Sequence, residues 1–272
     1  MRVIDVEGSG LDRGLMHGQQ LSDLIEEAME RWRKSVVDQR GMAVADFVKR
    51  FLAATDYIRI IGEYCPDLAA EVRGIALGSG QDPDEVMAFN LLDEEWWFEP
   101  NAVETGCSVI AARVLSGEDE EESTLLAQNM DLPLVLDGSQ ALLRIRQPDA
   151  PEQVVLTAAG RIGLTGVNAA GLGICVNTLL SLRRSTSGLP VAFVLREALK
   201  QVDAESAAAF LRSIPHASGQ HYVVADPAHT IGLECSAGGC AEGPRDLELV
   251  HTNHPLWSDD FDEGRLPPMH ST

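Results

Sequence analysis

The stretch Gly106-Cys107-Ser108-Val109-Ile110 is the point at which the pattern of this sequence changes. Before it, apolar residues recur every three or four positions, as they do along one face of an amphipathic helix. After it, β-branched and apolar residues come in short runs separated by glycine, proline or acidic turns, as in hairpin-connected strands. We therefore predict a helical region over residues 1–106 and a sheet-rich region over residues 107–272, which together form one structural domain.

The helical region is expected to hold at least three helices. One apolar stripe predicts a helix over about residues 12–38, and a second stripe continues over about residues 47–61. Asp82 is followed by a proline and, three positions later, by Glu85, which is the arrangement of a capping box at a helix start. A short helix is therefore expected from there to about Leu92.

The sheet-rich region is expected to hold strands with two helices between them. Helices are predicted over residues 191–202 and 204–214, with Pro190 and Asp203 at their starts. This order predicts an α+β fold with helices outside antiparallel sheets. A doubly wound fold is not expected, because strands and helices do not alternate. The predicted strands are Cys107–Leu115, Thr124–Met130, Ala141–Ile145, Gln153–Thr157, Gly171–Asn177, His221–Ala225, Thr230–Glu234 and Leu247–Thr252.

Composition excludes several classes of partner. The chain of 272 residues is 45% apolar, and its 42 acidic and 21 basic residues give a formal charge of -21. Such a surface repels nucleic acid and anionic lipid. No apolar run approaches the roughly 20 residues that cross a bilayer, and the start MRVIDVEGSG lacks a secretory signal pattern. We expect a cytoplasmic protein, with the acidic run of residues 118–122 in a solvated hairpin loop.

The five cysteines do not form the pattern of a disulfide framework, because they are odd in number and scattered. Four of them are expected to be buried and inert: Cys65, Cys175, Cys235 and Cys240. Cys107 differs, because the glycine before it permits strained backbone angles that would expose the Gly106 carbonyl to the neighbouring thiol.

Several motifs occur in a fixed order around this cysteine. They are Gly106-Cys107-Ser108, Ala127-Gln128-Asn129-Met130-Asp131, residues 166–173 leading to Asn177, His251-Thr252-Asn253-His254, and the opening residues 8–18 with Gly14 and His17. With these motifs the chain resembles, over essentially its whole length, the penicillin acyltransferase-like family of N-terminal-nucleophile hydrolases, which comprises acyl-coenzyme A:6-aminopenicillanate acyltransferase and its relatives. The resemblance implies a four-layer αββα sandwich of antiparallel sheets.

The resemblance also implies a precursor, or zymogen, that cleaves itself between Gly106 and Cys107. The products are an α chain of residues 1–106 and a β chain that begins at Cys107. The Cys107 thiol attacks the Gly106 carbonyl, and water then releases the upstream chain. The new α-amine, with a reference pKa of about 8, can accept the proton of its own thiol.

Three further residues receive roles from the resemblance. Asp131 orients the nucleophile, Asn253 donates to the oxyanion, and the backbone N–H of Asn177 completes the oxyanion site. Asp131 follows the strand predicted to pair with that of Cys107, so a hairpin can return it to the thiol. Read without the family, Asp131 is a turn residue and the asparagines are strand-end caps.

Two alternatives use histidine. Cys235 and Cys240 with His251 and His254 approximate a zinc ligand set, but the spacings differ from those of zinc fingers. A papain-like pairing of Cys107 with a histidine has no local signature. We therefore expect no metal and no cofactor.

Departures from the family concern the site and the end of the chain. Leu91-Leu92-Asp93-Glu94 stands where an arginine and a glutamate are expected after Asn90. Relatives continue well past the His-Thr-Asn-His motif, so we expect a C-terminally truncated chain with an exposed sheet edge and an incomplete pocket.

The predicted function is that of a cysteine amidohydrolase or acyltransferase. It would act on a small N-acyl amide or an acyl thioester such as acyl-CoA through an acyl group on Cys107, and hydrolysis is favoured. A homodimer of processed heterodimers is compatible with this reading. The competing hypothesis is a catalytically inactive homologue or fragment that acts only by association.

Overall fold

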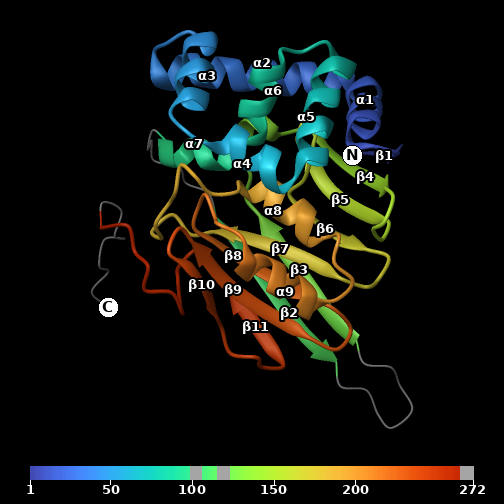
Figure 1. Cartoon of the computed structure of the whole chain (residues 1–272), viewed down its shortest axis with the longest axis vertical. Coiled ribbons are helices and arrows are strands. Elements are labelled where there is room, and N and C mark those ends of the chain that lie inside the picture. The colour runs from blue at the N-terminus through green and yellow to red at the C-terminus, as the bar shows by residue number, and fades with distance from the viewer. Residues whose placement is uncertain (99–105, 115–122, 264–272) are drawn as a thin grey trace.

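The computed structural model describes residues 1–98, 106–114 and 123–263 (Figure 1). The elements of the first part are β1 (Arg2–Glu7), α1 (Gly10–Gln20), α2 (Ser22–Arg40), α3 (Val44–Ala53), α4 (Tyr57–Tyr64), α5 (Pro66–Ser79), α6 (Pro83–Asn90) and α7 (Leu92–Phe98). Those of the second part are β2 (Cys107–Val114), β3 (Ser123–Met130), the 3₁₀ helix η1 (Leu134–Leu136), β4 (Gln140–Arg146), β5 (Gln153–Ala158), β6 (Thr165–Asn168), β7 (Gly173–Thr178), α8 (Val191–Ala198), α9 (Ala204–Ser213), β8 (Gln220–Ala225), β9 (Thr230–Ser236), β10 (Gly239–Glu242) and β11 (Glu248–His251).

The described strands form two sheets. The larger has eight strands in the order β1-β4-β5-β6-β7-β8-β9-β10, and the smaller has three in the order β11-β2-β3. The strand pairs are antiparallel except for β1 with β4, which confirms the predicted α+β fold with antiparallel sheets. The parallel pair was not predicted. It needs a long crossover connection, and the chain between β1 and β4 contains α1–α7 followed by β2, β3 and η1.

The large sheet lies between a helical layer and the small sheet. Apolar residues on one of its faces, such as Ile174 and Val224, pack in one core with residues of α1–α6, α8 and α9. On the other face, Cys175 and Val223 pack with Val109 of β2 in a second core between the sheets. Figure 1 shows α8 and α9 in front of the large sheet and β2, β3 and β11 with it in the lower half of the molecule.

The outer face of the small sheet is open to solvent among the described residues. Ile110, Leu125 and Val250 on this face are 52–65% exposed. The described part of the chain therefore has three layers, helices, large sheet and small sheet. The second helical layer of the expected αββα sandwich has no counterpart there.

The helical region is more finely divided than its periodicity suggests. The helix expected over residues 12–38 is two helices, α1 and α2, which meet at Leu21 (φ -118°). α1 lies against α5 so closely that a Cβ atom on Gly14 would fall 2.0 Å from the Glu71 carbonyl oxygen. The predicted helix start is confirmed, since the Asp82 side chain accepts hydrogen bonds from two backbone N–H groups of α6. The Glu85 carboxylate, expected to complete the capping box, pairs with Arg33 at 2.6 Å.

Three short strands were not predicted, namely β1, β6 and β10. β6 and β10 have four residues each, too few for alternation to be recognised. The expected acidic hairpin loop at residues 118–122 lies outside the described residues. In the described part of the chain, no helix has the length and apolar character that a bilayer crossing requires.

Candidate functional site

The register of the small sheet places Cys107 between two of the predicted site residues. β2 is the middle strand, with β3 on one side and β11 on the other. The pairing of β2 with β3 is the predicted hairpin, and its continuation sets Gly106 opposite Asp131, whose backbone N–H donates to the Gly106 carbonyl oxygen at 2.9 Å. Just beyond β11, the Asn253 Oδ1 atom accepts the Cys107 N–H at 2.6 Å. Both polar groups of the Gly106–Cys107 peptide bond are thus hydrogen-bonded by predicted site residues.

Gly106 provides space rather than unusual backbone angles. It is not among the glycines with a positive φ, so the strained conformation expected from sequence is not present. A Cβ atom on Gly106 would instead lie 3.0 Å from Asp131 Oδ2. The glycine therefore allows the Asp131 carboxylate to approach the peptide bond. Asn129 Nδ2 donates to the other carboxylate oxygen at 3.0 Å and holds it in place.

Asn253 connects the two sheets. Its Nδ2 atom donates to the Thr178 carbonyl oxygen of β7 at 2.8 Å, while its Oδ1 atom faces Cys107. The side chain is therefore oriented by a bond at each end. In the uncleaved chain the amide oxygen therefore accepts from Cys107, and the amide nitrogen is directed at β7.

Asn177 is fully buried and positions the segment that carries Asn253. Its Nδ2 atom donates to the carbonyl oxygens of His251 and Thr252, at 3.0 and 3.2 Å. Two residues after Asn177, the Leu179 N–H donates to the Gly219 carbonyl oxygen next to β8. In an antiparallel pair, residues two apart on one strand direct their N–H groups to the same side. The Asn177 N–H therefore also points toward β8. In the uncleaved chain, the side chain of Asn177 thus supports the site from behind, and its N–H is directed into the sheet.

The histidines of the His-Thr-Asn-His motif do not join the cysteines as the zinc reading required. His251 Nε2 lies 2.8 Å from Glu234 Oε1, and its ring stacks on His221 with centroids 3.6 Å apart. Glu234 precedes Cys235 in β9, so the two side chains point to opposite faces of the sheet. The papain-like alternative also lacks support, because no histidine lines the pocket beside Cys107 among the described residues.

A narrow apolar pocket adjoins Cys107. Its apolar lining comes from α7, from strands and their ends, from α8 and from the turn after β5, and its cavity volume is about 40 Å³. That space is enough for a thin aliphatic group and a few water molecules. The apolar lining residues are Trp96, Met130, Leu132, Leu164, Val176, Val191, Ala192 and Leu195.

Two acidic residues face this pocket, Asp93 and Asp131. Asp93 forms an ion pair with the buried Arg161. Sequence reasoning did not select Asp93 or Arg161 as site residues. One feature of the sequence could have pointed to Asp93. It lies in the segment after Asn90 that differs from the sequence expected for the family.

The thiol of Cys107 is not activated in the uncleaved chain. Burial raises its pKa to about 11. The backbone N–H of Asp131 lowers the pKa, whereas the negative charges of the Asp93 and Asp131 carboxylates raise it. At neutral pH the thiol is therefore protonated. Thiolate chemistry at this site needs a further base or a nearby positive charge.

The chain is similar in sequence to known proteins. The family model "Acyl-coenzyme A:6-aminopenicillanic acid acyl-transferase" matches residues 118–264, more than half of the chain. The acyl-coenzyme A:6-aminopenicillanic-acid-acyltransferase 40 kDa form of Emericella nidulans is 27% identical over 274 residues, which cover 99% of this chain and 73% of that protein.

Two solved structures are also similar over part of the chain. Penicillin V acylase from Agrobacterium tumefaciens matches with a TM-score of 0.29 and 14% identity over 56% of this chain. A mutant of conjugated bile acid hydrolase from Clostridium perfringens matches with a TM-score of 0.32 and 15% identity over 55% of this chain. The matches span 43% and 46% of those chains, less than half of each. On the extent of the family-model match, the chain belongs to the acyl-coenzyme A:6-aminopenicillanic acid acyl-transferase family.

Proposed function

We propose that the chain is a self-processing cysteine amidohydrolase or acyltransferase of the N-terminal-nucleophile type, with Cys107 as its nucleophile. One observation carries the proposal. The carbonyl of Gly106 and the N–H of Cys107 are hydrogen-bonded by Asp131 and Asn253, and the same cysteine lines an apolar pocket. A peptide bond held in this way is poised for attack by the adjacent thiol.

In the cleavage step, the Cys107 sulfur attacks the Gly106 carbonyl carbon. The Asp131 N–H, which already donates to that carbonyl oxygen, stabilises the oxyanion. The C–N bond breaks, the thiol proton passes to the departing nitrogen, and Gly106 becomes a thioester on the Cys107 sulfur. Water then hydrolyses the thioester, which releases a Gly106 carboxylate and regenerates the thiol beside a free α-amine.

Cleavage also explains how the thiol becomes reactive. The peptide nitrogen of Cys107 cannot act as a base, whereas an α-amine with a reference pKa of about 8 can accept the thiol proton. The resulting ammonium group would lie beside Asn253 Oδ1 and near Asp131, where the uncleaved N–H lies now. A thiolate next to that positive charge is stabilised, which opposes the effect of burial.

The pocket supports a substrate class. Its narrow apolar lining suits the acyl part of a small amide or thioester. Asn253 Nδ2 donates one N–H to Thr178, and its second N–H would donate to the oxyanion as the acyl group transfers to sulfur. Water or an amine then takes the acyl group from Cys107. We favour hydrolysis of small N-acyl amides, because transfer needs a specialised acyl donor and acceptor. The name of the Emericella nidulans relative pairs acyl-coenzyme A with 6-aminopenicillanic acid, and transfer from an acyl thioester is the alternative reaction of the same site.

The decisive experiment is to determine the N-termini of the purified protein by mass spectrometry. The unchanged protein should yield one chain that ends at Gly106 and one that begins at Cys107. Cys107→Ala should remain uncleaved, and the matched control Cys175→Ala, which removes a different buried thiol, should still be cleaved. An uncleaved protein whose Cys107 is also not acylated by a thiol-directed reagent would support the inactive homologue instead.

Hydrolysis and transfer are separated by a second assay. The processed protein is incubated with a small N-acyl amide, quenched in acid and digested, and the acylated peptide is identified. The acyl group should be found on the peptide that begins at Cys107. Release of free acid in the presence of an added amine supports hydrolysis, and accumulation of the new amide supports transfer.

A further inference from the structure

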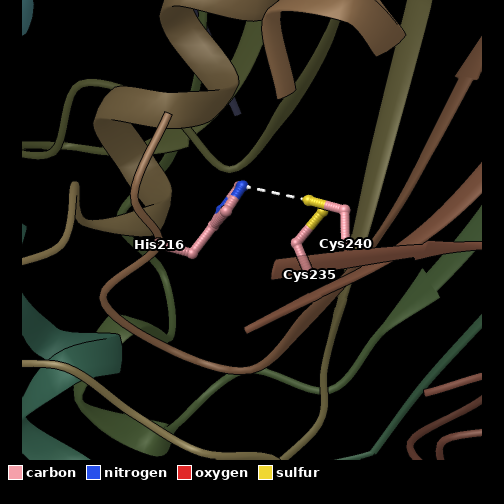
Figure 2. A group of neighbouring side chains, drawn as sticks. All are labelled: His216, Cys235 and Cys240. Atoms are coloured by element: carbon pink, nitrogen blue, oxygen red, sulfur yellow. Dashed lines mark hydrogen bonds between the residues drawn. The ribbon is translucent and has the colours of Figure 1, made fainter. Parts of the chain in front are cut away.

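A second group of reactive side chains lies on the helical side of the large sheet, and the function proposed above does not use it. Cys235 of β9 and Cys240 of β10 lie directly opposite each other, and His216 reaches them from the segment between α9 and β8 (Figure 2). One donor atom from each of the three residues lies within 4.8 Å of the other two. His216 and Cys235 are buried, and Cys240 is partly exposed.

The strand register brings the two sulfur atoms together. Gly243 N–H donates to the Gly232 carbonyl oxygen at 3.0 Å in the same register, so the alternation of the antiparallel ladder makes Cys235 and Cys240 a non-hydrogen-bonded pair. Side chains of such a pair are closer to each other than those of a hydrogen-bonded pair. The two thiols are therefore fixed side by side by the backbone.

The position of His216 matches the edge of a tetrahedral metal site. Its Nε2 atom is 3.5 Å from the Cys240 sulfur. Zinc binds thiolate at about 2.3 Å and imidazole at about 2.0–2.1 Å, and two such ligands at a tetrahedral angle are about 3.5 Å apart. The observed distance thus needs little change for both atoms to bind one ion.

A backbone oxygen is available as a fourth ligand. The Leu211 carbonyl oxygen lies 2.8 Å from His216 Nε2 and 3.5 Å from the Cys240 sulfur. In a regular helix it would accept the N–H four residues later, but that residue is Pro215, which has none. The oxygen is therefore free of helical bonding and is directed at the same cluster.

We propose that Cys235, Cys240 and His216, with the Leu211 carbonyl, form a binding site for a thiophilic metal ion, for which Zn²⁺ is the representative. On binding, both thiol protons are released to solvent, and the imidazole proton moves from Nε2 to Nδ1 so that Nε2 can coordinate. The Leu211 oxygen then coordinates the ion instead of accepting from Nε2. Two thiolates leave an overall neutral site around a divalent ion.

The two thiols also interact with each other. The hydrogen bond from Cys235 lowers the pKa of the Cys240 thiol to about 5, against the effect of burial, and His216 contributes to the lowering. Burial raises the pKa of Cys235 well above its ordinary value. Binding of the ion would displace the thiol protons, because cysteine coordinates a metal as the thiolate.

The ion would have a structural effect. Among the described strands, β10 lies at the edge of the large sheet and pairs with β9 alone. Coordination would join the β9–β10 hairpin to the end of α9 and to the start of β8. The sheet edge would therefore gain stability that depends on the metal concentration. The site shares no lining residue with the pocket at Cys107, so the proposal does not depend on the proposed function.

The test is a titration of reduced, metal-free protein with Co²⁺ under anaerobic conditions. The Cys107→Ala variant is used, so that the candidate nucleophile cannot bind the ion. One equivalent of Co²⁺ should produce a thiolate-to-cobalt charge-transfer band and the visible bands of a tetrahedral site. One equivalent of Zn²⁺ should remove these bands and raise the Tm.

Matched variants decide which residues carry the signal. Adding Cys240→Ser or Cys235→Ala should abolish the charge-transfer band, with folding checked by far-ultraviolet circular dichroism. His216→Gln should keep a weaker band and bind Co²⁺ at least tenfold less tightly. The control Cys65→Ala, which removes a buried thiol elsewhere, should leave the titration unchanged. Absence of the band from reduced protein, or its persistence in both the Cys235 and Cys240 variants, would overturn the proposal.

Discussion

Glu71 is the centre of a buried charge cluster that spans the proposed cleavage point. This α5 residue accepts from Arg13 Nε of α1 at 2.9 Å and from Arg196 Nη1 of α8 at 2.7 Å. All three side chains are at most 1% exposed. Asp67 adds a second carboxylate, 2.6 Å from Arg13. Two cations and two anions therefore balance one another, and the pair of Glu71 with Arg196 links residues on the two sides of Gly106.

Replacing Glu71 with glutamine should destabilise the protein strongly. The variant keeps the size of the side chain but leaves the buried cluster with one uncompensated positive charge. Removing one partner of a buried ion pair costs about 3–5 kcal/mol, because the other charge stays buried. We expect a loss of that size at pH 7. Glu63→Gln is the matched control, since Glu63 pairs with Arg59 at 3.2 Å while both side chains are 60% exposed. Such pairs contribute about 0.2–1 kcal/mol.

Urea unfolding at equilibrium measures both variants. Glu71→Gln should lower the midpoint at an unchanged m-value, which identifies a change in stability rather than in compactness. Burial alone raises the pKa of Glu71, but Arg196 and Arg13 outweigh it and hold the pKa below its ordinary value of 4.5. The stabilisation is therefore complete above about pH 4.5 and is lost as the pH falls toward the lowered value. A loss below about 1 kcal/mol, similar to that of the control, would refute the reasoning, because no buried charge would then be uncompensated.

Three further predictions concern the surroundings of the candidate site. Burial raises the pKa of Glu94 to about 8, and the charge of Asp93 raises it further. The free energy of unfolding should therefore fall as the pH rises from about 4.5 to 8, because the unfolded chain ionises first. Glu94→Gln should remove that pH dependence in urea unfolding. Asn90 is fully buried and bonds the turn after β5 at 2.8 Å through both ends of its amide, so Asn90→Ala should lower the Tm by several degrees in calorimetry, equivalent to about 2–3 kcal/mol. The alkylation rate of uncleaved Cys107 should rise with pH toward the pKa of about 11, whereas a midpoint below 8 in the uncleaved chain would contradict the role assigned to the α-amine.

Local patterns determined the class and order of the elements. Apolar periodicity placed the helices before Gly106 and most of the strands after it, because burial on one face leaves a repeat in the sequence. Caps were equally visible, as Asp82 and Asp203 show by accepting backbone N–H bonds at helix starts. The pairing of β2 with β3 followed from the short connection between two adjacent runs. Each of these features depends on residues that are close in sequence.

The register of distant strands was decided only by the tertiary structure. The sequence motifs selected Asn253, yet its approach to Cys107 depends on how β11 aligns with β2 across more than a hundred residues of chain. The packing of distant segments also places Asp93 in the lining of the pocket. It likewise places His216, rather than His251, beside Cys235 and Cys240. Sequence alone thus determined which residues are polar, apolar or nucleophilic and which local elements they form. Which of them meet was set by the packing of helices and sheets, because contacts between remote segments depend on the whole core and leave no periodic signal in either segment.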